Sequence, residues 1–323
     1  MLKYFLCVVV LVSCGEAVPT TPMQEAPGAS VDDVRFLLWT KSNSGDGAYY
    51  EVVLDDSGSL NGSPLNANDP TVVLIHGFSS SGDSGWPVDA KTELLKQGSY
   101  NVISVDWGKL AAAPWYLTAV ANVPLVGAHT ATFLDWLKAS VGLDTSKLQI
   151  TGHSLGAHVS GAVGQNVASF TVPAITGLDP AGPEFYSKPT SERLDASDAA
   201  FVQIIHTNGG EILQSCVGLA DTAGQVDFFP NGGVHQPGCV DLGEWTDLLE
   251  GGCSHGRSHL FWVESINGSP AFRAHPCDDW TSYENGQCSS CGAGCLEMGF
   301  HVSRSLRGTY FLTTNSDPPY AQG

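Results

Sequence analysis

Basic side chains are scarce in this sequence of 323 residues. Lys and Arg number 14 against 33 Asp and Glu, which gives a formal net charge of −19 at pH 7. A surface this acidic repels the phosphate groups of nucleic acids and of anionic membranes. The composition therefore excludes a nucleic-acid-binding role, and a lipid substrate would have to be approached through apolar contacts.

Long apolar runs are rare as well, and the clearest one stands near the N-terminus. It covers 4–12, follows a lysine and is followed by small residues up to Ala17. This order is typical of a secretory signal peptide, and the run is too short to span a bilayer. We therefore expect a signal peptide at 1–17, a flexible lead-in at 18–30 and a single domain at 31–323, secreted to the extracellular space.

A second candidate for a membrane span, residues 114–137, is interrupted. Pro124, His129 and Asp135 break its apolar character, whereas a span needs about 20 consecutive, predominantly apolar residues. We expect this stretch to form a largely buried helix of a soluble protein.

Cysteine is absent between Cys14 and Cys216. Of nine cysteines, Cys7 and Cys14 belong to the expected signal peptide, and the other seven lie in the second half of the chain. In an oxidising compartment such cysteines predict disulfides. The Cys288-x-x-Cys291 spacing also occurs in zinc and redox sites, but the secretory signal argues against both uses. Seven is odd, so one cysteine stays outside the bridges or pairs with another chain.

Short apolar segments alternate with segments of helical spacing from Thr71 to His206. This alternation predicts a doubly wound, mostly parallel β-sheet with helices on both faces. In such sheets functional groups gather at the carboxyl ends of the strands, where the sequence places His76, Asp106, Ser154, Asp179 and His206. We expect strands at 34–39, 49–54, 71–75, 101–105, 147–151, 173–178 and 201–205, and helices at 88–97, 116–141, 157–168 and 259–266.

The central motif is Gly152-His153-Ser154-Leu155-Gly156, between a predicted strand and a predicted helix. A Gly-x-Ser-x-Gly in this setting is typical of a nucleophile elbow, in which a sharp turn exposes the serine. Side chains at the glycine positions would collide with the neighbouring strand and helix. A serine hydroxyl needs a base, and the base needs an orienting carboxylate. We therefore predict a hydrolase with Ser154 as its nucleophile.

The acid and the base should follow the serine in the chain. Asp179, one strand after the elbow, is the favoured acid, with Asp195 and Asp198 as alternatives further from a strand end. His255 is the favoured base because it lies in a loop that we expect a disulfide to hold, just before a predicted helix. His259 is only slightly less favoured, and the other downstream histidines are His206, His235, His275 and His301.

The oxyanion hole should consist of two backbone amides. One belongs to Leu155, the residue after the nucleophile, and the other to Phe78, in the loop that follows the strand at 71–75.

Eight stretches of the chain stand in a characteristic order: 73–78, 150–158, 176–181, 193–198, 205–207, 226–233, 237–239 and 253–258. Together they resemble the pancreatic-lipase family of secreted lipases and phospholipases A1. The resemblance implies an α/β-hydrolase fold with a mostly parallel central sheet and helices on both faces. It also implies Ser154, Asp179 and His255 as the catalytic triad, with Phe78 and Leu155 as the oxyanion hole.

The resemblance further implies a structural calcium ion, while the chemistry itself requires no cofactor. The carboxylates of Asp195 and Asp198 and the backbone carbonyls of Thr190 and Arg193 would be its ligands. Oxygen ligands from a tight loop suit calcium, although two aspartates three residues apart also occur at solvated helix starts.

The family's bridges match three cysteine pairs of this chain. The resemblance implies the disulfides Cys239–Cys253, Cys277–Cys288 and Cys291–Cys295, and it leaves Cys216 over.

Two departures from the large digestive lipases bear on the substrate. The loop 240–252 is short where their lid is long, and the chain ends soon after Thr313, so we expect neither a C-terminal β-sandwich domain nor a colipase partner. A short lid leaves a site open to phospholipid head groups, which favours phospholipase A1-like cleavage at the sn-1 ester. The alternatives are a neutral triacylglycerol or galactolipid lipase and, less favoured, a non-catalytic binding or storage protein.

Four apolar residues of the short loop would serve for peripheral contact with a lipid surface, or would simply pack against the protein. They are Leu242, Trp245, Leu248 and Leu249.

Overall fold

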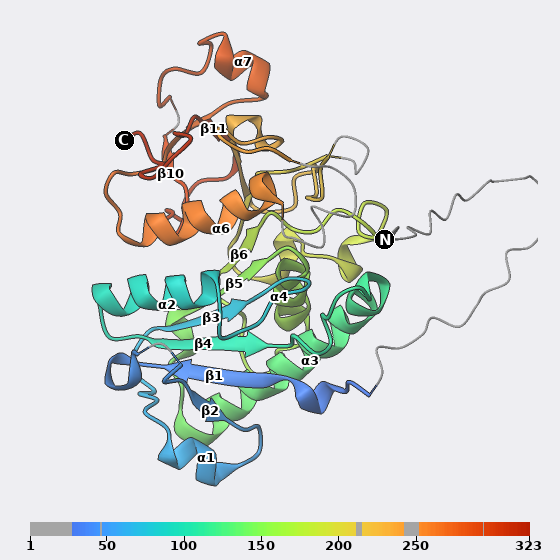
Figure 1. Ribbon diagram of the computed structural model, residues 1–323. Helices are drawn as coiled ribbons and strands as arrows, with labels where there is room; N and C mark the ends of the chain where they lie inside the picture. Colours follow the sequence, from blue (N-terminus) through green and yellow to red (C-terminus); the bar gives the residue numbers. More distant parts are fainter. Residues whose placement is uncertain (1–27, 46, 211–214, 242–251, 293) are drawn as a thin grey trace, which may run out of the picture.

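A computed structural model describes residues 28–45, 47–210, 215–241, 252–292 and 294–323 of the chain (Figure 1). The expected signal peptide lies outside the described residues, as do the four apolar residues of the loop after Asp241.

One mixed sheet of 11 strands organises the fold, in the order β10-β9-β11-β8-β7-β6-β5-β3-β4-β1-β2. Between β11 and β4 in this order, that is in the run β11-β8-β7-β6-β5-β3-β4, adjacent strands pair parallel. At the two edges, β1 and β2 on one side and β9 and β10 on the other pair antiparallel. The strands are β1 Arg35–Trp39, β2 Tyr50–Val52, β3 Thr71–Ile75, β4 Asn101–Asp106, β5 Leu148–His153, β6 Ile175–Leu178, β7 Val202–Ile205, β8 Val226–Pro230, β9 Arg273–Pro276, β10 Leu296–Glu297 and β11 Gly308–Leu312.

Helices cover both faces of this sheet, which confirms the predicted α/β-hydrolase architecture (Figure 1). The α-helices are α1 Ser57–Gly62, α2 Trp86–Gln97, α3 Tyr116–Val141, α4 Leu155–Asn166, α6 Cys253–Ile266 and α7 Trp280–Glu284. Short 3-10 turns join them: η1 Val31–Asp33, η2 Lys41–Asn43, η3 Thr145–Lys147, η4 Thr190–Glu192, η5 Ala196–Asp198 and η7 Asn231–Gly233.

Two apolar cores lie on opposite faces of the sheet. Because side chains alternate along a strand, Val73 and Ile75 of β3 enter the core that α3 and α4 cover. Val72 and Leu74 enter the other core, which α2 and α6 cover. Burial on both faces is what an uninterrupted apolar strand predicts.

The helix α3 has the bounds that the sequence predicts, and its chain continues through Pro124. By length and composition alone it could cross a membrane, yet 50% of its most apolar window is buried inside the protein. Its buried side faces α4 at a contact so close that a Cβ on Gly127 would lie 2.3 Å from the Cβ of Ala162. The two helices therefore pack with almost no side chain between them at this point.

Replacing Gly127 by leucine tests this contact. Helix propensity alone would favour leucine by about 0.8 kcal/mol, but overpacking against Ala162 should outweigh that gain and lower the free energy of unfolding by about 1–3 kcal/mol. Urea denaturation measures the difference. Ala121→Leu, on the exposed side of α3, is the control and should change stability by less than about 0.5 kcal/mol. An equally stable Gly127→Leu protein would contradict the packing described here.

Candidate active site

Ser154 stands at the turn between β5 and α4. Its backbone has φ 58° and ψ −123°, a strained conformation for a residue with a side chain. A Cβ on Gly152 would lie 2.1 Å from the carbonyl oxygen of Gly156, and one on Gly156 would lie 2.2 Å from the oxygen of Ile75. Both positions therefore require glycine, as the motif predicts.

Asp179 follows β6 and is completely buried. Its Oδ1 accepts hydrogen bonds from the backbone amides of Thr207, at 2.8 Å, and Asn208, at 3.0 Å. Its Oδ2 lies 2.6 Å from Nδ1 of His255. A carboxylate can only accept, so Nδ1 of His255 donates this bond and Nε2 is left to accept a proton.

Strand pairing brings Ser154 and Asp179 to one edge of the sheet, and His255 reaches Asp179 from α6. His153 of β5 pairs with Leu178 of β6, and the amide of Ser154 donates to the carbonyl of Leu178 at 3.0 Å. The imidazole of His255 lies against that of His153, with ring centroids 4.5 Å apart. The structure thus joins His255 directly to Asp179 and places Ser154 at the end of the neighbouring strand.

The position of His255 within the secondary structure differs from the expectation. We predicted a loop before a helix at 259–266, but α6 begins at Cys253 and includes His255 in its first turn. The carbonyl of His255 accepts bonds from Ser258 Oγ at 2.9 Å and from Thr207 Oγ1 at 3.4 Å. The helix, not a loop, therefore holds this imidazole in place.

His259, the rival base, has a different environment. It lies one turn further along α6, beside Trp86, and its Nδ1 is buried without a hydrogen-bond partner. Burial, with a smaller contribution from His255, lowers the pKa of His259 to about 3. The pKa of His153 is lowered well below its usual value by burial and by the neighbouring imidazoles. Both rings are therefore neutral at pH 7 and place no competing charge beside His255.

His206 is excluded as a base because both of its ring nitrogens are occupied. Nε2 lies 2.9 Å from Oδ1 of Asp227, and Nδ1 lies 2.9 Å from the carbonyl of Leu219. Burial opposes the charged form, but the bond to Asp227, the negative charges of Asp227 and Asp179 and the carbonyl of Leu219 together raise the pKa of His206. The ring also stacks on Phe229, at 4.4 Å between centroids. The bond between His206 and Asp227 therefore joins the end of β7 to β8, next to Asp179.

Phe78 and Leu155, the two expected oxyanion-hole residues, flank Ser154. The segment before Phe78 touches the nucleophile, since a Cβ on Gly77 would lie 2.8 Å from the Cβ of Ser154. His76 braces this segment by accepting from the amide of Trp107 at 3.1 Å. Leu155 is the first residue of α4, where backbone amides have no partner within the helix and the helix dipole favours negative charge. Both amides are therefore candidates for binding a developing oxyanion.

Sequence reasoning missed Asn208, which connects Asp179 to its surroundings. Besides its amide bond to Asp179, its Oδ1 accepts from the amide of Val217 at 2.9 Å and its carbonyl accepts from the amide of Gly218 at 2.9 Å. Its Nδ2 donates to the carbonyls of Ser215 and Val234. Asn208 thus fixes the segment 215–219 over the carboxylate. The only sequence signal was its place just after a strand end.

Asp195 and Asp198 lie apart from the triad, in the turn η5 that packs on α4. Asp195 Oδ1 accepts from the amide of Ser197 at 2.9 Å, and Asp198 Oδ2 accepts from the amide of Asp195 at 2.8 Å. Burial, with a smaller effect of Asp195, raises the pKa of Asp198 to about 6. Asp198 Oδ1 also accepts a hydrogen bond from Gln165 Nε2 at 2.9 Å. A divalent cation would offset the negative charge of the two carboxylates, and all proposed ligand atoms are oxygens. The residues therefore fit the expected cation.

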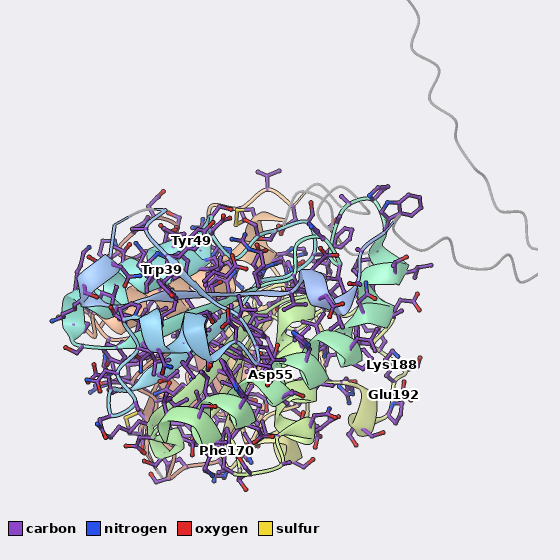
Figure 2. The ribbon with its side chains drawn as sticks, turned by 90° about the horizontal axis from the view of Figure 1, so that it is seen from below. Trp39, Tyr49, Asp55, Phe170, Lys188 and Glu192 are labelled. Atoms are coloured by element: carbon purple, nitrogen blue, oxygen red, sulfur yellow. A yellow bond between two sulfur atoms is a disulfide. The ribbon has the colours of Figure 1, made fainter. Side chains whose placement is uncertain are left out.

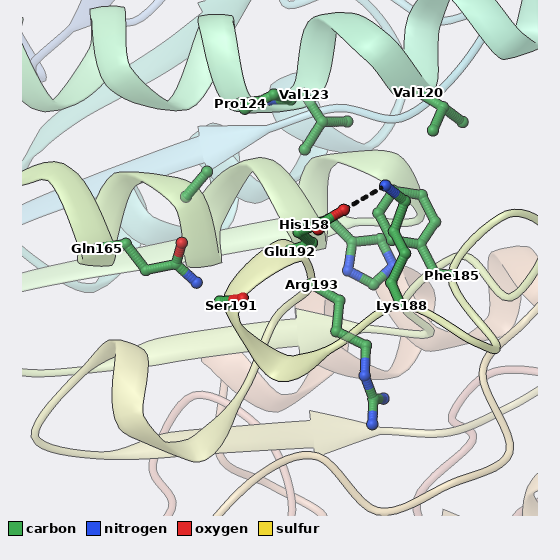
Figure 3. Close-up of a pocket in the computed structure, with 11 residues that line it drawn as sticks. Val120, Val123, Pro124, His158, Gln165, Phe185, Lys188, Ser191, Glu192 and Arg193 are labelled. Atoms are coloured by element: carbon green, nitrogen blue, oxygen red, sulfur yellow. Dashed lines mark hydrogen bonds and ion pairs between the residues drawn. The ribbon is translucent and has the colours of Figure 1, made fainter.

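A cavity of about 100 Å³ lies between α3, α4 and the segment 185–193, and none of the triad residues lines it (Figure 3). His158 forms part of its wall and stacks on Phe185, at 3.7 Å between centroids. Lys188 and Glu192 form an ion pair of 3.0 Å beside it, and Figure 2 shows the pair at the margin of the molecule. Nothing in this cavity bears on the chemistry at Ser154.

The structure contains the disulfides Cys239–Cys253, Cys277–Cys288 and Cys291–Cys295, and the buried Cys216 takes part in none of them. The Sγ of Cys295 lies 3.5 Å from Nδ1 of His275, but a bridged sulfur is not a thiolate ligand. This arrangement favours the disulfide interpretation of the Cys288-x-x-Cys291 spacing over a zinc site.

Comparison with known proteins gives a consistent set of relatives. The sequence profile of a family described as Lipase matches residues 7–320. Pancreatic triacylglycerol lipase of Homo sapiens is 37% identical over 296 residues, which cover 88% of this chain and 63% of that protein. Pancreatic lipase-related protein 3 of Homo sapiens is 38% identical over 312 residues, covering 90% and 65%. The chain thus spans less than two thirds of either relative.

Solved structures match this chain only in part. A crystal structure of esterase PE8 matches with a TM-score of 0.33 and 19% identity, covering 43% of this chain and 68% of that one.

Gly218→Ala tests whether the segment 215–219 must lie this close to the carboxylate. The new Cβ would lie 2.5 Å from Oδ2 of Asp179, so the acid or the segment must shift. Because displacements of about 1 Å can cost about 100-fold in rate, we expect ester hydrolysis to fall by about that factor. Gly45→Ala, whose Cβ would stand 3.6 Å from its nearest neighbour, should leave the rate unchanged. Full activity of Gly218→Ala would contradict a positioned acid.

Proposed function

Since the chain belongs to the lipase family, we propose that it is a secreted serine hydrolase that cleaves acyl esters of glycerolipids. The observation that carries this proposal is the 2.6 Å contact between His255 and the buried Asp179, beside a serine in a strained strand-to-helix turn. The secretory pattern of the N-terminus and the disulfides support an extracellular location.

In the proposed mechanism Ser154 Oγ attacks the ester carbonyl while Nε2 of His255 takes its proton. Asp179 holds Nδ1–H of the imidazole and stabilises the imidazolium that forms. The amides of Phe78 and Leu155 bind the oxygen of the tetrahedral intermediate. The imidazolium then returns its proton to the departing alcohol, which leaves an acyl-enzyme. Water attacks this ester by the same route, with His255 again accepting and returning the proton, and releases the fatty acid.

The catalytic groups are expected to contribute unequally to the rate of hydrolysis. Loss of one oxyanion donor typically costs about 100- to 1,000-fold in rate. Loss of the orienting carboxylate typically costs about 10⁴-fold, because the imidazole then rests in the wrong tautomer. All the reacting groups come from the chain, so the proposed chemistry needs no cofactor.

The proposed substrate is a phospholipid, cleaved at its sn-1 ester. The supporting feature is the short loop 240–252, which the Cys239–Cys253 bridge closes across a separation of 14 residues. The name of the relative that acts on triacylglycerol supports the alternative, a neutral lipase. A storage protein without catalysis is less well supported, because the elbow strain and the buried acid serve no purpose there.

Product analysis distinguishes these substrates. We expect purified protein to release the sn-1 acid from a phosphatidylcholine with two different acyl chains at least ~10-fold faster than it releases oleic acid from triolein, a difference of ~1.4 kcal/mol in transition-state binding. Faster triolein hydrolysis would instead identify a neutral lipase. Ser154→Ala should lower either activity by roughly a million-fold, and a fully active variant would refute the assignment of the nucleophile.

Calcium binding is a separate proposal, with Asp195 and Asp198 and the carbonyls of Thr190 and Arg193 as ligands. Calcium in ~100-fold excess over its Kd should stabilise the fold by about 2.7 kcal/mol, or about 5–10 °C in Tm. Because the ligand carboxylates bind when deprotonated, the shift should shrink as the pH falls through the Asp198 pKa of about 6.

Thermal unfolding in calcium and in a chelator measures this shift. The double variant Asp195→Asn/Asp198→Asn should unfold at the same temperature in both solutions. An equal calcium-dependent shift in the parent and the variant would exclude these residues as ligands.

A further inference from the structure

The first half of α3 is apolar on its exposed side as well as on its buried side. No Asp, Glu, Lys or Arg occurs between Lys109 and Asp135. Leu117 and Leu125 are 47% and 55% exposed. The exposed Ala121 and Pro124 lie at helical spacing with these leucines, and the exposed Pro114 lies just before the helix. We call these five residues the α3 face.

This face is unusual for the surface of this protein. Single exposed leucines need no explanation, but a contiguous apolar face without charge marks a site of contact. The net charge of −19 makes a stretch of 25 residues without any charge more distinctive still. The opposite side of the helix, with Ala119, Val123 and Val126, is already buried in the core. The exposed side is therefore not needed for packing within the described chain.

The α3 face borders the candidate active site. Tyr116, in the first turn of α3, packs edge-on against the ring of Phe78 at 5.2 Å between centroids. Its hydroxyl donates to the carbonyl of Pro183 at 3.0 Å. The beginning of α3 also lies on the side of the molecule toward which β3 and β4 point (Figure 1). A surface that contacts the α3 face would therefore be close to the entrance of the site.

We propose that the α3 face docks on an uncharged or zwitterionic lipid surface and so presents the active site to its substrate; this inference rests on the proposed function. The lack of charged residues in the α3 face favours a lipid surface without net charge as its partner. The face's own residues offer apolar insertion and carry no charge, and Lys188, which lines the cavity beside Pro124, is paired with Glu192 at 3.0 Å. The acidic remainder of the protein repels anionic head groups. A phosphatidylcholine surface has an apolar acyl-chain region beneath head groups that carry no net charge. The area of two half-exposed leucines is enough for weak, reversible attachment.

Vesicle binding of the catalytically silent Ser154→Ala protein measures this attachment without digestion of the lipid. We expect it to sediment with phosphatidylcholine vesicles and to bind less well when about a third of the lipid is phosphatidylglycerol at low salt. Adding Leu117→Ser and Leu125→Ser should lower the partition coefficient by at least ~10-fold. Each single variant should lower it by a smaller factor, which keeps the test informative if the double variant unfolds.

Leu260→Ser is the matched control. Leu260 is 36% exposed and lies on α6, on the opposite face of the sheet. This variant should bind vesicles like its Ser154→Ala parent. Equal melting temperatures of the variants would show that the changes act at the surface.

Three results would overturn the proposal. The first is a parent protein that does not bind phosphatidylcholine vesicles, and the second is α3 variants that bind as well as the parent. The third is a concentration-dependent dimer, seen by sedimentation, that the α3 variants dissolve while vesicle binding stays the same, because a second copy would then cover the face. A protein with intact Ser154 that binds vesicles through α3 but does not hydrolyse a soluble butyrate ester would refute the proposed function and leave the docking surface standing.

Discussion

The buried carboxylate of Asp179 is the group on which the rest of the site depends. A charge removed from water is costly unless it is paired and hydrogen-bonded. Here two backbone amides after β7 and the imidazole of His255 supply those partners. The end of β7 and the first turn of α6 must therefore both be in place before Asp179 can be buried as an anion. The same contacts that make burial tolerable also set the tautomer of the imidazole.

The sheet brings these groups together through ordinary strand pairing. Parallel neighbours end at the same edge, so Ser154 after β5 and Asp179 after β6 are adjacent although 25 residues separate them in the chain. The close contact of the elbow with its neighbouring backbone requires glycine, because there is no room for a side chain at positions 152 and 156. His255 arrives from a distant helix on the other face. The α3 face then lies beside the entrance because α3 leads away from that same edge.

Much of this arrangement could be predicted from local sequence, and the errors have physical causes. The parallel strands, the bounds of α3 and the elbow at Ser154 follow from apolar periodicity and glycine spacing. The predicted start of α6, at His259, was wrong. Gly252 and Gly256 have low helix propensity, but packing of α6 on the sheet and the Cys239–Cys253 bridge override that propensity. The contacts of Asn208 could not be predicted, since each partner is brought to it by tertiary structure. The strands β8 to β11 escaped notice because β8 and β11 pair across 82 residues of chain.

The most direct test of this account is covalent labelling with an organophosphonate, which reacts only with a serine that a base activates and an oxyanion hole receives. After digestion, mass spectrometry locates the adduct. We predict a single adduct on Ser154 that disappears when His255 is replaced by alanine. An adduct on another residue, or none on a folded protein, would contradict the proposed catalytic centre.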